Sequence, residues 1–264
     1  MTLHIVVTAK QVIDPETPLS AFQIDSNRVR PPQQPPVVNG YDENAVEAAL
    51  RVKEAVGDAR VTVLSMGTEF TLDVVKKPLA MGADALVLLQ DPLFANSIDP
   101  TLAVRVLTAA ITKLGDVGLV LCGRQASDWD NAQVPLGIAE ALGWPVATIA
   151  KGVSVEGETL RVERVLPEGH EVVEAALPAV VTVSNELGQA RYPNMRGIMA
   201  ARRVQPETWS AADLGLDAAE LAPQLELVSL IKPDRSVQTE MITGEDEADA
   251  GRKLALRLRE ARLL

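Results

Sequence analysis

Short apolar runs alternate with amphipathic segments along the first half of the chain. Four apolar runs, at residues 3–9, 61–64, 85–89 and 119–122, are typical of strands buried on both faces. The segments between them, at 42–56, 71–81 and 99–114, repeat apolar positions with helical periodicity. This alternation predicts an α/β fold with a doubly wound, mostly parallel, Rossmann-like sheet, in which ligands bind beyond the carboxyl ends of the strands.

Residues with strong local preferences mark the expected element boundaries. Asp42 is the candidate cap of the first helix, and Asp99, followed by a proline, is the candidate cap of the third. Pro78 should kink or shorten the second helix. Because residues 31–36 are rich in proline, we expect an extended loop over 15–38.

The second half of the chain begins as a continuation of the same pattern and then changes. We expect a helix over 134–142 and strands over 146–149 and 179–183. Between those strands, short strands at 153–155, 160–165 and 172–176 predict antiparallel ribbons at the sheet edge. Residues 205–240 show no sustained period, and a charged helix over 245–263 ends the chain. The pattern therefore predicts a domain over 1–204 and a C-terminal arm and helix over 205–264.

Charge and cysteine content narrow the class of protein. The net charge of −11 and isoelectric point near 4.8 would repel nucleic acid and anionic lipid surfaces. The single cysteine, Cys122, lies in an apolar run, which favours a buried, inert thiol and a reducing compartment. The chain shows neither a signal-peptide pattern nor an apolar run of membrane-spanning length, so we expect a soluble, cytoplasmic protein.

Four loops follow predicted strands and should meet at one edge of the sheet: residues 8–10, 39–42, 65–67 and 123–134. In the last loop, Gly123 allows a close backbone approach and Arg124 can neutralise a phosphate, while the following helix offers free N–H groups. Gln125, Asn131 and Gln133 can bind a ribose or base edge. These residues fit a nucleotide, although residue types alone fit a plain connector equally well.

Other potential sites are weaker. The two histidines, His4 at an expected edge position of the first strand and His170 in a turn, have no cysteine or carboxylate neighbours at ligand spacing. The sequence contains neither a Gly-x-Ser-x-Gly motif nor a P-loop. We therefore expect neither a metal site nor catalytic residues in this chain.

The amino-acid sequences of several segments resemble those of the beta subunit of electron-transfer flavoproteins. The matching segments are residues 9–14, 39–42, 79–84, 122–128, 177–183, 191–192 and 197–199. The resemblance implies an electron-carrying heterodimer in which the strand-end loops of this chain enclose an adenine nucleotide. The FAD would lie mainly on the alpha subunit and face this chain across the interface.

The resemblance also implies the contact residues and the kind of ligand. Residues 122–134 are similar to the electron-bifurcating type, whose beta subunit holds a second FAD that meets NADH; the common type holds AMP. We favour FAD. Tyr41 would lie closest to the interface flavin. The implied contacts are Thr8, Ala9, Asn39, Gly40, Tyr41, Asp42, Ser65, Met66, Gly67, Gly123, Arg124, Gln125, Ala126, Ser127, Asp128, Asp130, Asn131, Ala132, Gln133 and Val134.

A docking loop over 191–200 is implied in the same way, with Tyr192, Met195 and Arg196 as its contacts. Met195 is either a loop filler or, as the resemblance favours, the hydrophobic anchor on a dehydrogenase. The arginines at 191, 196, 202 and 203 would face acidic partner surfaces. The implied partners are the alpha subunit, against which the arm would pack, an acyl-CoA or similar dehydrogenase, and a quinone oxidoreductase or other acceptor.

Two other functions fit the predicted fold. An ATP-using hydrolase or ligase would need a Ser- and Gly-rich phosphate loop after the first strand, but residues 8–12 contain no glycine. A small nucleotide-sensing module should be stable alone, whereas a chain with an unpatterned arm should need its partner.

Overall fold

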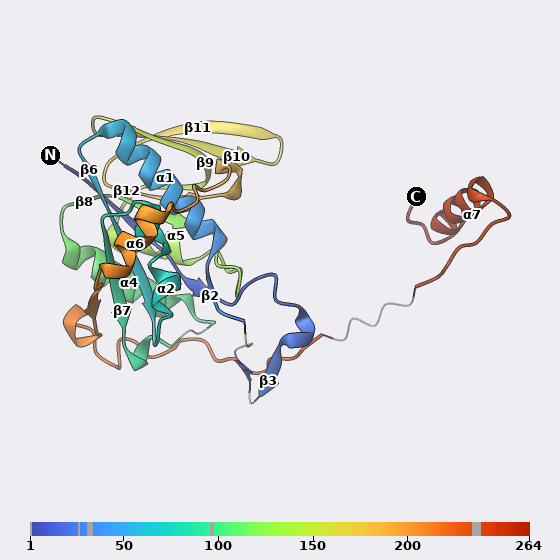
Figure 1. The fold of residues 1–264 in the computed structure, drawn as a ribbon, viewed down its shortest axis with the longest axis horizontal. Coiled ribbons are helices and arrows are strands. Elements are labelled where there is room, and N and C mark those ends of the chain that lie inside the picture. The colour runs from blue at the N-terminus through green and yellow to red at the C-terminus, as the bar shows by residue number, and fades with distance from the viewer. Residues whose placement is uncertain (1, 26, 31–33, 96–97, 234–238) are drawn as a thin grey trace. The chain divides into compact units, whose positions relative to one another are not determined.

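The computed structural model describes residues 2–25, 27–30, 34–95, 98–233 and 239–264 (Figure 1). Two compact units divide the chain, Met1–Ser229 and Leu230–Leu264. Within the described part of the first unit, nine strands form one sheet in the order β11-β10-β9-β12-β8-β1-β6-β7-β13. The strands at its centre are β1 (Leu3–Thr8), β6 (Ala59–Gly67), β7 (Ala85–Gln90), β8 (Val117–Gly123) and β12 (Ala179–Val183).

The central strands are parallel, and their order reverses beside β1. The chain passes from β1 to β6 and β7 on one side, then crosses to β8 and β12 on the other. Val7 of β1 is in register with Val63 of β6 and with Leu121 of β8. The reversal places a topological switch point between β1 and β8, where open α/β sheets bind ligands.

Helices cover both faces of this sheet (Figure 1). On one face α1 (Gly40–Val56) contributes Val46 to an apolar cluster with Leu119. On the other, α4 (Pro100–Leu114) and α5 (Val134–Leu142) contribute Ile111 and Ile138 to a second cluster. The predicted doubly wound, mostly parallel α/β fold is confirmed, because each face buries its own set of apolar side chains.

The expected antiparallel ribbons lie at one edge of the sheet. They are formed by β9 (Val146–Glu156), β10 (Thr159–Leu166) and β11 (Gly169–Ala176). The two strands expected at 146–149 and 153–155 are one strand, β9. It begins parallel to β12 and continues as the antiparallel partner of β10, with a left-handed residue, Ile149, where the register shifts.

Two local expectations need correction. The expected extended loop over 15–38 contains short strands: β3 (Gln23–Asp25) pairs with β4 (Arg28–Arg30), and β5 (Val37–Val38) pairs with β2 (Gln11–Val12). Residues 31–33 of the Pro-rich stretch lie outside the described residues. The second helix, expected over 71–81, is two short helices, α2 (Leu72–Val75) and α3 (Lys77–Met81). Pro78 lies in the first turn of α3, in agreement with the expected kink or shortening.

The first unit extends beyond the boundary expected after residue 204. The strand β13 (Glu207–Trp209) pairs in parallel with β7 and buries Trp209, so the stretch up to Ser229 belongs with the sheet. A three-residue strand is too short for a periodic pattern to show in the sequence.

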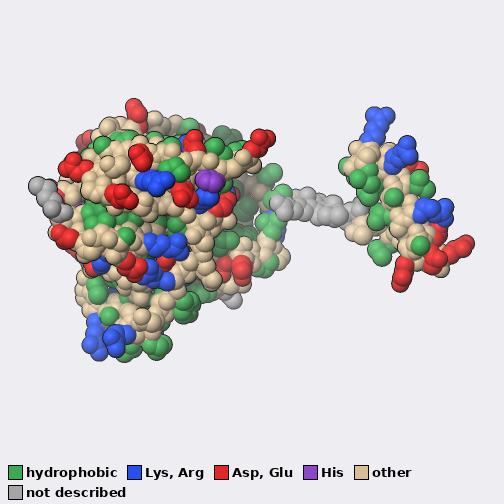
Figure 2. All heavy atoms as spheres, turned by 90° about the horizontal axis from the view of Figure 1, so that it is seen from above, with side chains coloured by type: hydrophobic (Ala, Val, Ile, Leu, Met, Phe, Trp, Pro, Cys, Tyr) green, Lys and Arg blue, Asp and Glu red, His purple; other side chains and the backbone are tan. Residues whose placement is uncertain are grey.

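The second unit contains the expected charged helix, α7 (Glu247–Glu260), capped by the side chain of Asp246. Leu254 and Leu256 are about half exposed, and Figure 2 shows hydrophobic and charged side chains together on this unit's surface. On the viewed face of the first unit, acidic and basic side chains are intermingled (Figure 2). No helix in the described ranges combines the length and apolar character needed to cross a membrane.

Candidate functional site

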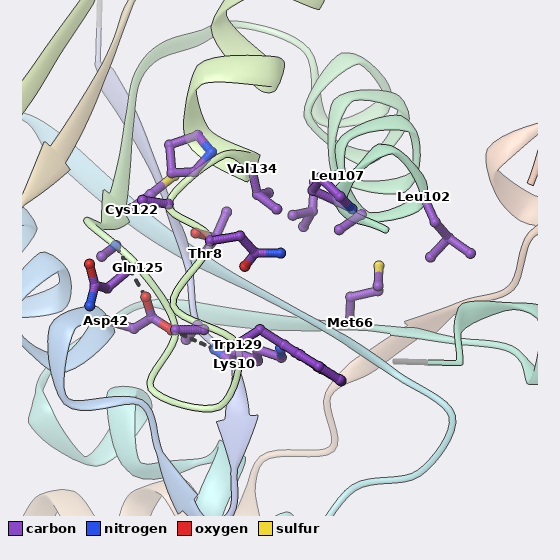
Figure 3. A pocket seen from close by; sticks show the side chains of 18 of the residues that line it. Thr8, Lys10, Asp42, Met66, Leu102, Leu107, Cys122, Gln125, Trp129 and Val134 are labelled. Carbon is purple, nitrogen blue, oxygen red and sulfur yellow. Dashed lines mark hydrogen bonds between the residues drawn. The ribbon is translucent and has the colours of Figure 1, made fainter. Parts of the chain in front are cut away.

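A pocket opens at the switch point, where β1, β6 and β8 end and α4 and α5 begin (Figure 3). One side is polar, with Lys10, Asp42 and Gln125; the other is apolar, with Met66 and helix α4. The lining residues are Thr8, Ala9, Lys10, Asp42, Leu64, Met66, Ala95, Asp99, Pro100, Leu102, Ala103, Leu107, Cys122, Gly123, Gln125, Ala126, Trp129, Asn131, Ala132, Val134 and Pro135.

Two buried residues at the start of α1 hold the loop that follows β8. The side-chain amide of Asn39 donates to the carbonyl of Gln125 at 2.8 Å and accepts from the backbone N–H of Ser127 at 3.3 Å. The carboxylate of Asp42 accepts from the backbone N–H of Lys10 at 2.8 Å and of Gly123 at 3.1 Å. Three chain segments are thereby fixed at one rim of the pocket.

These contacts correct the expected capping. Asn39, not Asp42, stands at the cap position of α1, and its side chain makes no capping hydrogen bond within the part of the chain that the structure describes. Asp42 lies within the first helical turn, where a carboxylate is stabilised by the positive end of the helix dipole. The cap predicted at Asp99 is confirmed, because its carboxylate accepts from the backbone N–H of Thr101 at 2.9 Å.

Gly123 is required by the close approach of two backbones. A Cβ at this position would lie 2.8 Å from the backbone nitrogen of Asp42 and from the carbonyl carbon of Tyr41. Both atoms are backbone, so the overlap could not be relieved by a rotamer change. The glycine therefore allows the end of β8 to lie directly against the start of α1.

Burial dominates the electrostatics of Asp42. Desolvation raises its pKa to about 7, although the amides of Lys10 and Gly123, the Asn39 side chain and the Lys10 charge oppose the shift. Burial likewise raises the pKa of the Cys122 thiol to about 12. The inert, buried thiol expected at Cys122 is thus consistent with both its 1% exposure and its pKa.

Several polar groups near the pocket are buried without a hydrogen-bond partner among the described residues. They are Ser65 Oγ, Arg124 Nε and Ser127 Oγ. The guanidinium of Arg124 lies over the ring of Tyr41, 4.9 Å from its centroid. Helix α5 begins without a side-chain cap among the described residues, and Pro135 in its first turn has no N–H to donate. Unpaired donors beside a helix N-terminus suit an anionic, hydrogen-bonding ligand such as a nucleotide.

The loop from Gly123 to Val134 is further shaped by local contacts. Lys10 pairs with Asp128 at 2.7 Å, and Gln125 donates to Asp130 at 2.8 Å. Asp130 and Ala132 both adopt left-handed backbone conformations, with φ of 52° and 53°. Such residues cost energy and recur where a loop is shaped for a ligand.

The structure brings part of the predicted site together around the pocket. The predicted residues that line it are Thr8, Ala9, Asp42, Met66, Gly123, Gln125, Ala126, Asn131, Ala132 and Val134. The others are not in this lining as the described residues define it: Asn39, Gly40, Tyr41, Ser65, Gly67, Arg124, Ser127, Asp128, Asp130 and Gln133. Ligand contact by either group stays a prediction.

Sequence reasoning missed the wall of the pocket formed by α4. Leu102 and Leu107 line it, but both lie on the helix face that also packs in the core. Their apolar periodicity gave no separate signal. Lys10 also lines the pocket and lies in a predicted loop, but it is not among the predicted contacts.

The predicted docking residues are at the surface. Tyr192 is 89% and Met195 73% exposed, and Arg196 is also exposed. The expected loop over 191–200 is helical from Met195 onward, as part of α6 (Met195–Arg203). The expectation for Arg191 was wrong, because its guanidinium is paired with Glu47 and Glu54 within this chain.

His4, near the start of the first strand, is held by contacts within the sheet. It lies on the central strand β1, is 2% exposed, and makes a 2.9 Å hydrogen bond to Thr62 and a 3.0 Å contact with Arg60. Burial and the Arg60 charge lower its pKa. His4 is therefore a neutral structural residue.

Comparison with known proteins agrees with this architecture. Residues 32–214 match the electron transfer flavoprotein domain. The chain belongs to the electron transfer flavoprotein family. It is 38% identical over 214 residues to the electron transfer flavoprotein subunit beta of Thermoanaerobacterium thermosaccharolyticum, covering 80% of this chain and 81% of that protein. It is 34% identical over 265 residues to the caffeyl-CoA reductase-Etf complex subunit CarD of Acetobacterium woodii, covering 99% and 100%.

The resemblance to electron transfer flavoprotein beta subunits is thereby confirmed. A beta subunit of Megasphaera elsdenii is also 38% identical, over 225 residues. Members of this family are components of electron carriers, and their chemistry belongs to a bound flavin.

Proposed function

We propose that this chain is the nucleotide-binding beta subunit of a heterodimeric electron transfer flavoprotein, and that the pocket beside β1 and β8 holds the adenosine part of its ligand. The observation that carries the proposal is the loop after β8, which Asn39 and Asp42 fix against the strand ends. Arg124 and Ser127 lie on this loop and Ser65 lies on the neighbouring strand β6, and each has a buried polar atom without a partner among the described residues. The pocket fits such a ligand, because an apolar wall for a ring faces polar groups for ribose and phosphate.

The proposed roles of this chain's residues follow from their positions. Gln125 and Asn131 bind ribose or base edges, and Arg124 with the start of α5 neutralises phosphate. Leu102 and Leu107 exclude water from one side of the ring. When bound, the flavin accepts and donates the electrons. This chain contributes binding, orientation and a dry wall, and it needs no acid or base for that task.

We further propose that the ligand is a second FAD and that the complex is of the bifurcating type, which oxidises NADH. Support comes from the sequence of residues 122–134, which is similar to the bifurcating type, and from the full-length similarity to the subunit of the caffeyl-CoA reductase-Etf complex. The test is to purify the heterodimer and measure FAD and AMP per dimer. Two FAD would support the proposal, and one FAD with one AMP would exclude bifurcation at this site.

We propose that Tyr192, Met195 and Arg196 form the docking segment for an acyl-CoA or similar dehydrogenase. Exposed aromatic and aliphatic side chains next to a positive charge suit a transient contact with an acidic partner. Met195→Glu in the heterodimer should slow reduction by acyl-CoA dehydrogenase at least several-fold without loss of flavin. An unchanged rate with a dehydrogenase that reduces the wild type would exclude the anchor role.

The second unit is proposed to pack on the alpha subunit. Its helix α7 has no buried residue in this chain alone, and Ile231, Met241 and Leu263 are more than two-thirds exposed. Apolar side chains at this exposure are stabilised by burial against a partner. Deleting residues 230–264 should therefore weaken heterodimer formation, which analytical gel filtration at decreasing concentration would measure.

A further inference from the structure

One side of helix α1 is occupied by polar side chains that contact the chain just before the docking segment. The residues recur at intervals of three or four and so lie on one stripe of the helix. We call them the α1 stripe: Asn44, Glu47, Arg51 and Glu54. Asn44 donates to the carbonyl of Gly188 at 2.7 Å, and Arg51 donates to the carbonyl of Leu187 at 3.2 Å.

Glu47 is at the centre of the α1 stripe and is only 4% exposed. One carboxylate oxygen accepts from Nε of Arg51 at 2.8 Å. The other accepts both the backbone N–H of Arg191 at 3.1 Å and its side-chain Nε at 2.8 Å. Glu54 takes the far side of the same guanidinium, with its two oxygens at 2.5 and 3.1 Å from the Arg191 nitrogens.

This arrangement fixes a backbone position as well as a side chain. Because Glu47 accepts a hydrogen bond from the main-chain N–H of Arg191, it fixes the position of the backbone immediately before the exposed Tyr192. Burial alone would raise the pKa of Glu47, but the hydrogen bonds from Arg191 and Arg51 lower it, so the carboxylate is charged at neutral pH. A buried charge held by planar, bidentate geometry is a precise positioning contact.

The other end of the docking segment is fixed by a close helix contact. Asn194 caps α6 by accepting from the N–H of Gly197 at 2.8 Å, and Gly197 lies against the carbonyl of Ala80 on α3. The exposed residues Tyr192 and Met195 thus lie between two fixed points, Arg191 and Gly197.

We propose that Glu47 is a positioning residue for partner docking: through Arg191 it holds the docking segment in the conformation that the dehydrogenase recognises. This inference rests on the proposed docking function of Tyr192, Met195 and Arg196. Loss of the Glu47–Arg191 contact removes none of the docking side chains, but it allows the backbone that enters the segment at Tyr192 to adopt many conformations. The partner must then select one of them, which weakens encounter and leaves transfer within the complex unchanged.

The test uses the full heterodimer and compares Glu47→Gln, Arg191→Lys, and the two combined. Glu43→Gln is the matched control, because Glu43 lies one turn earlier on α1 and pairs with Lys77 of α3 instead. Hydrogen exchange of residues 188–196 is measured on the heterodimer in the absence of the dehydrogenase. Steady-state reduction by acyl-CoA dehydrogenase, with the heterodimer as the varied substrate, separates KM from kcat.

Glu47→Gln and Arg191→Lys should each speed exchange of residues 188–196 and raise KM roughly five- to tenfold, with kcat and flavin content unchanged. The combined variant should be no worse than the more severe single one, because both remove the same contact. Glu43→Gln should keep wild-type values.

Unchanged exchange in both single variants, or KM effects that multiply in the combined variant, would overturn the inference. Met195→Glu separates this failure from that of the proposed function. If Met195→Glu slows reduction and Glu47→Gln does not, the docking function stands and the positioning role fails. If Met195→Glu has no effect either, docking by this segment fails as well.

Discussion

The carboxylate of Asp42 accepts a hydrogen bond from the backbone N–H of Gly123 at 3.1 Å, although the two residues are 81 positions apart. This contact joins the start of α1 to the end of β8, and the loop with the proposed nucleotide contacts leaves directly from it. The pocket is therefore shaped by a contact between two secondary-structure ends, and both residues are sites where small changes should have large effects.

Gly123→Ala should release the nucleotide and lower stability. The new Cβ would overlap the backbone of Tyr41 and Asp42, and such overpacking typically costs about 1–3 kcal/mol. The measurements are nucleotide content after denaturation and the thermal midpoint of the heterodimer. Gly251→Ala is the control, because a Cβ there meets no atom of the described residues within 4 Å and Gly251 is not among the predicted nucleotide contacts. Full nucleotide content in Gly123→Ala would argue against the close approach.

Asp42 should make stability depend on pH between about 4 and 7. Its folded pKa of about 7 lies above the ordinary 3.8, so its stabilising contribution is complete below pH 4 and is lost as pH rises through 7. The total change is on the order of 4 kcal/mol. Asp42→Asn removes this titration but also one acceptor, so the variant should start less stable and gain on the wild type as pH rises.

Thermal midpoints of both heterodimers from pH 5 to pH 8 measure this difference. A gap between wild type and Asp42→Asn that stays constant over that range would show that Asp42 is ionised throughout. In that case the hydrogen bonds from the N–H groups of Lys10 and Gly123 would lower the pKa of Asp42 by more than desolvation raises it.

Gly197→Ala should slow electron delivery by the dehydrogenase while the nucleotide stays bound. Alanine has a higher helix propensity than glycine, but a Cβ at position 197 would overlap the carbonyl of Ala80 and push α6 away from α3. Gly251→Ala in α7 has open space around it and should instead stabilise its helix by about 0.5–1 kcal/mol. Stopped-flow reduction rates would show the slower electron delivery in Gly197→Ala. Thermal midpoints would show the stabilisation in Gly251→Ala.

Cys122 should resist alkylation in the folded protein. Its side chain is buried and its pKa is raised to about 12, so the reactive thiolate is scarce at pH 8. Mass spectrometry after iodoacetamide treatment should find modification in denaturant and little without it. Rapid modification of the native heterodimer would mean that the pocket floor opens to solvent.

The sequence was sufficient where a local signal decides the structure. The Asp99 cap, the helix Val134–Leu142 and the strand Ala179–Val183 were predicted with the bounds that the structure has, because capping residues, prolines and apolar runs act over a few positions. The placement of the pocket at the strand ends followed from the parallel topology itself.

Contacts between distant segments were beyond the sequence. Aspartate and asparagine both cap helices, so nothing local indicates that Asp42 is used by amides at positions 10 and 123. Judged by its residue type and its neighbours in the sequence, Arg191 could serve as a docking residue. Its contact with Glu47, 144 positions away, is created only by the fold. The apolar pocket wall at Leu102 is likewise indistinguishable from core in the amino-acid pattern.

The most direct test of the account is the number of adenine compounds per heterodimer in the wild type and in Gly123→Ala. If the switch-point pocket holds an adenine nucleotide, the wild type should release two adenine compounds, either two FAD or one FAD with one AMP, and Gly123→Ala should release one. Release of a single FAD from the wild type, with the variant identical, would contradict a nucleotide site in this chain.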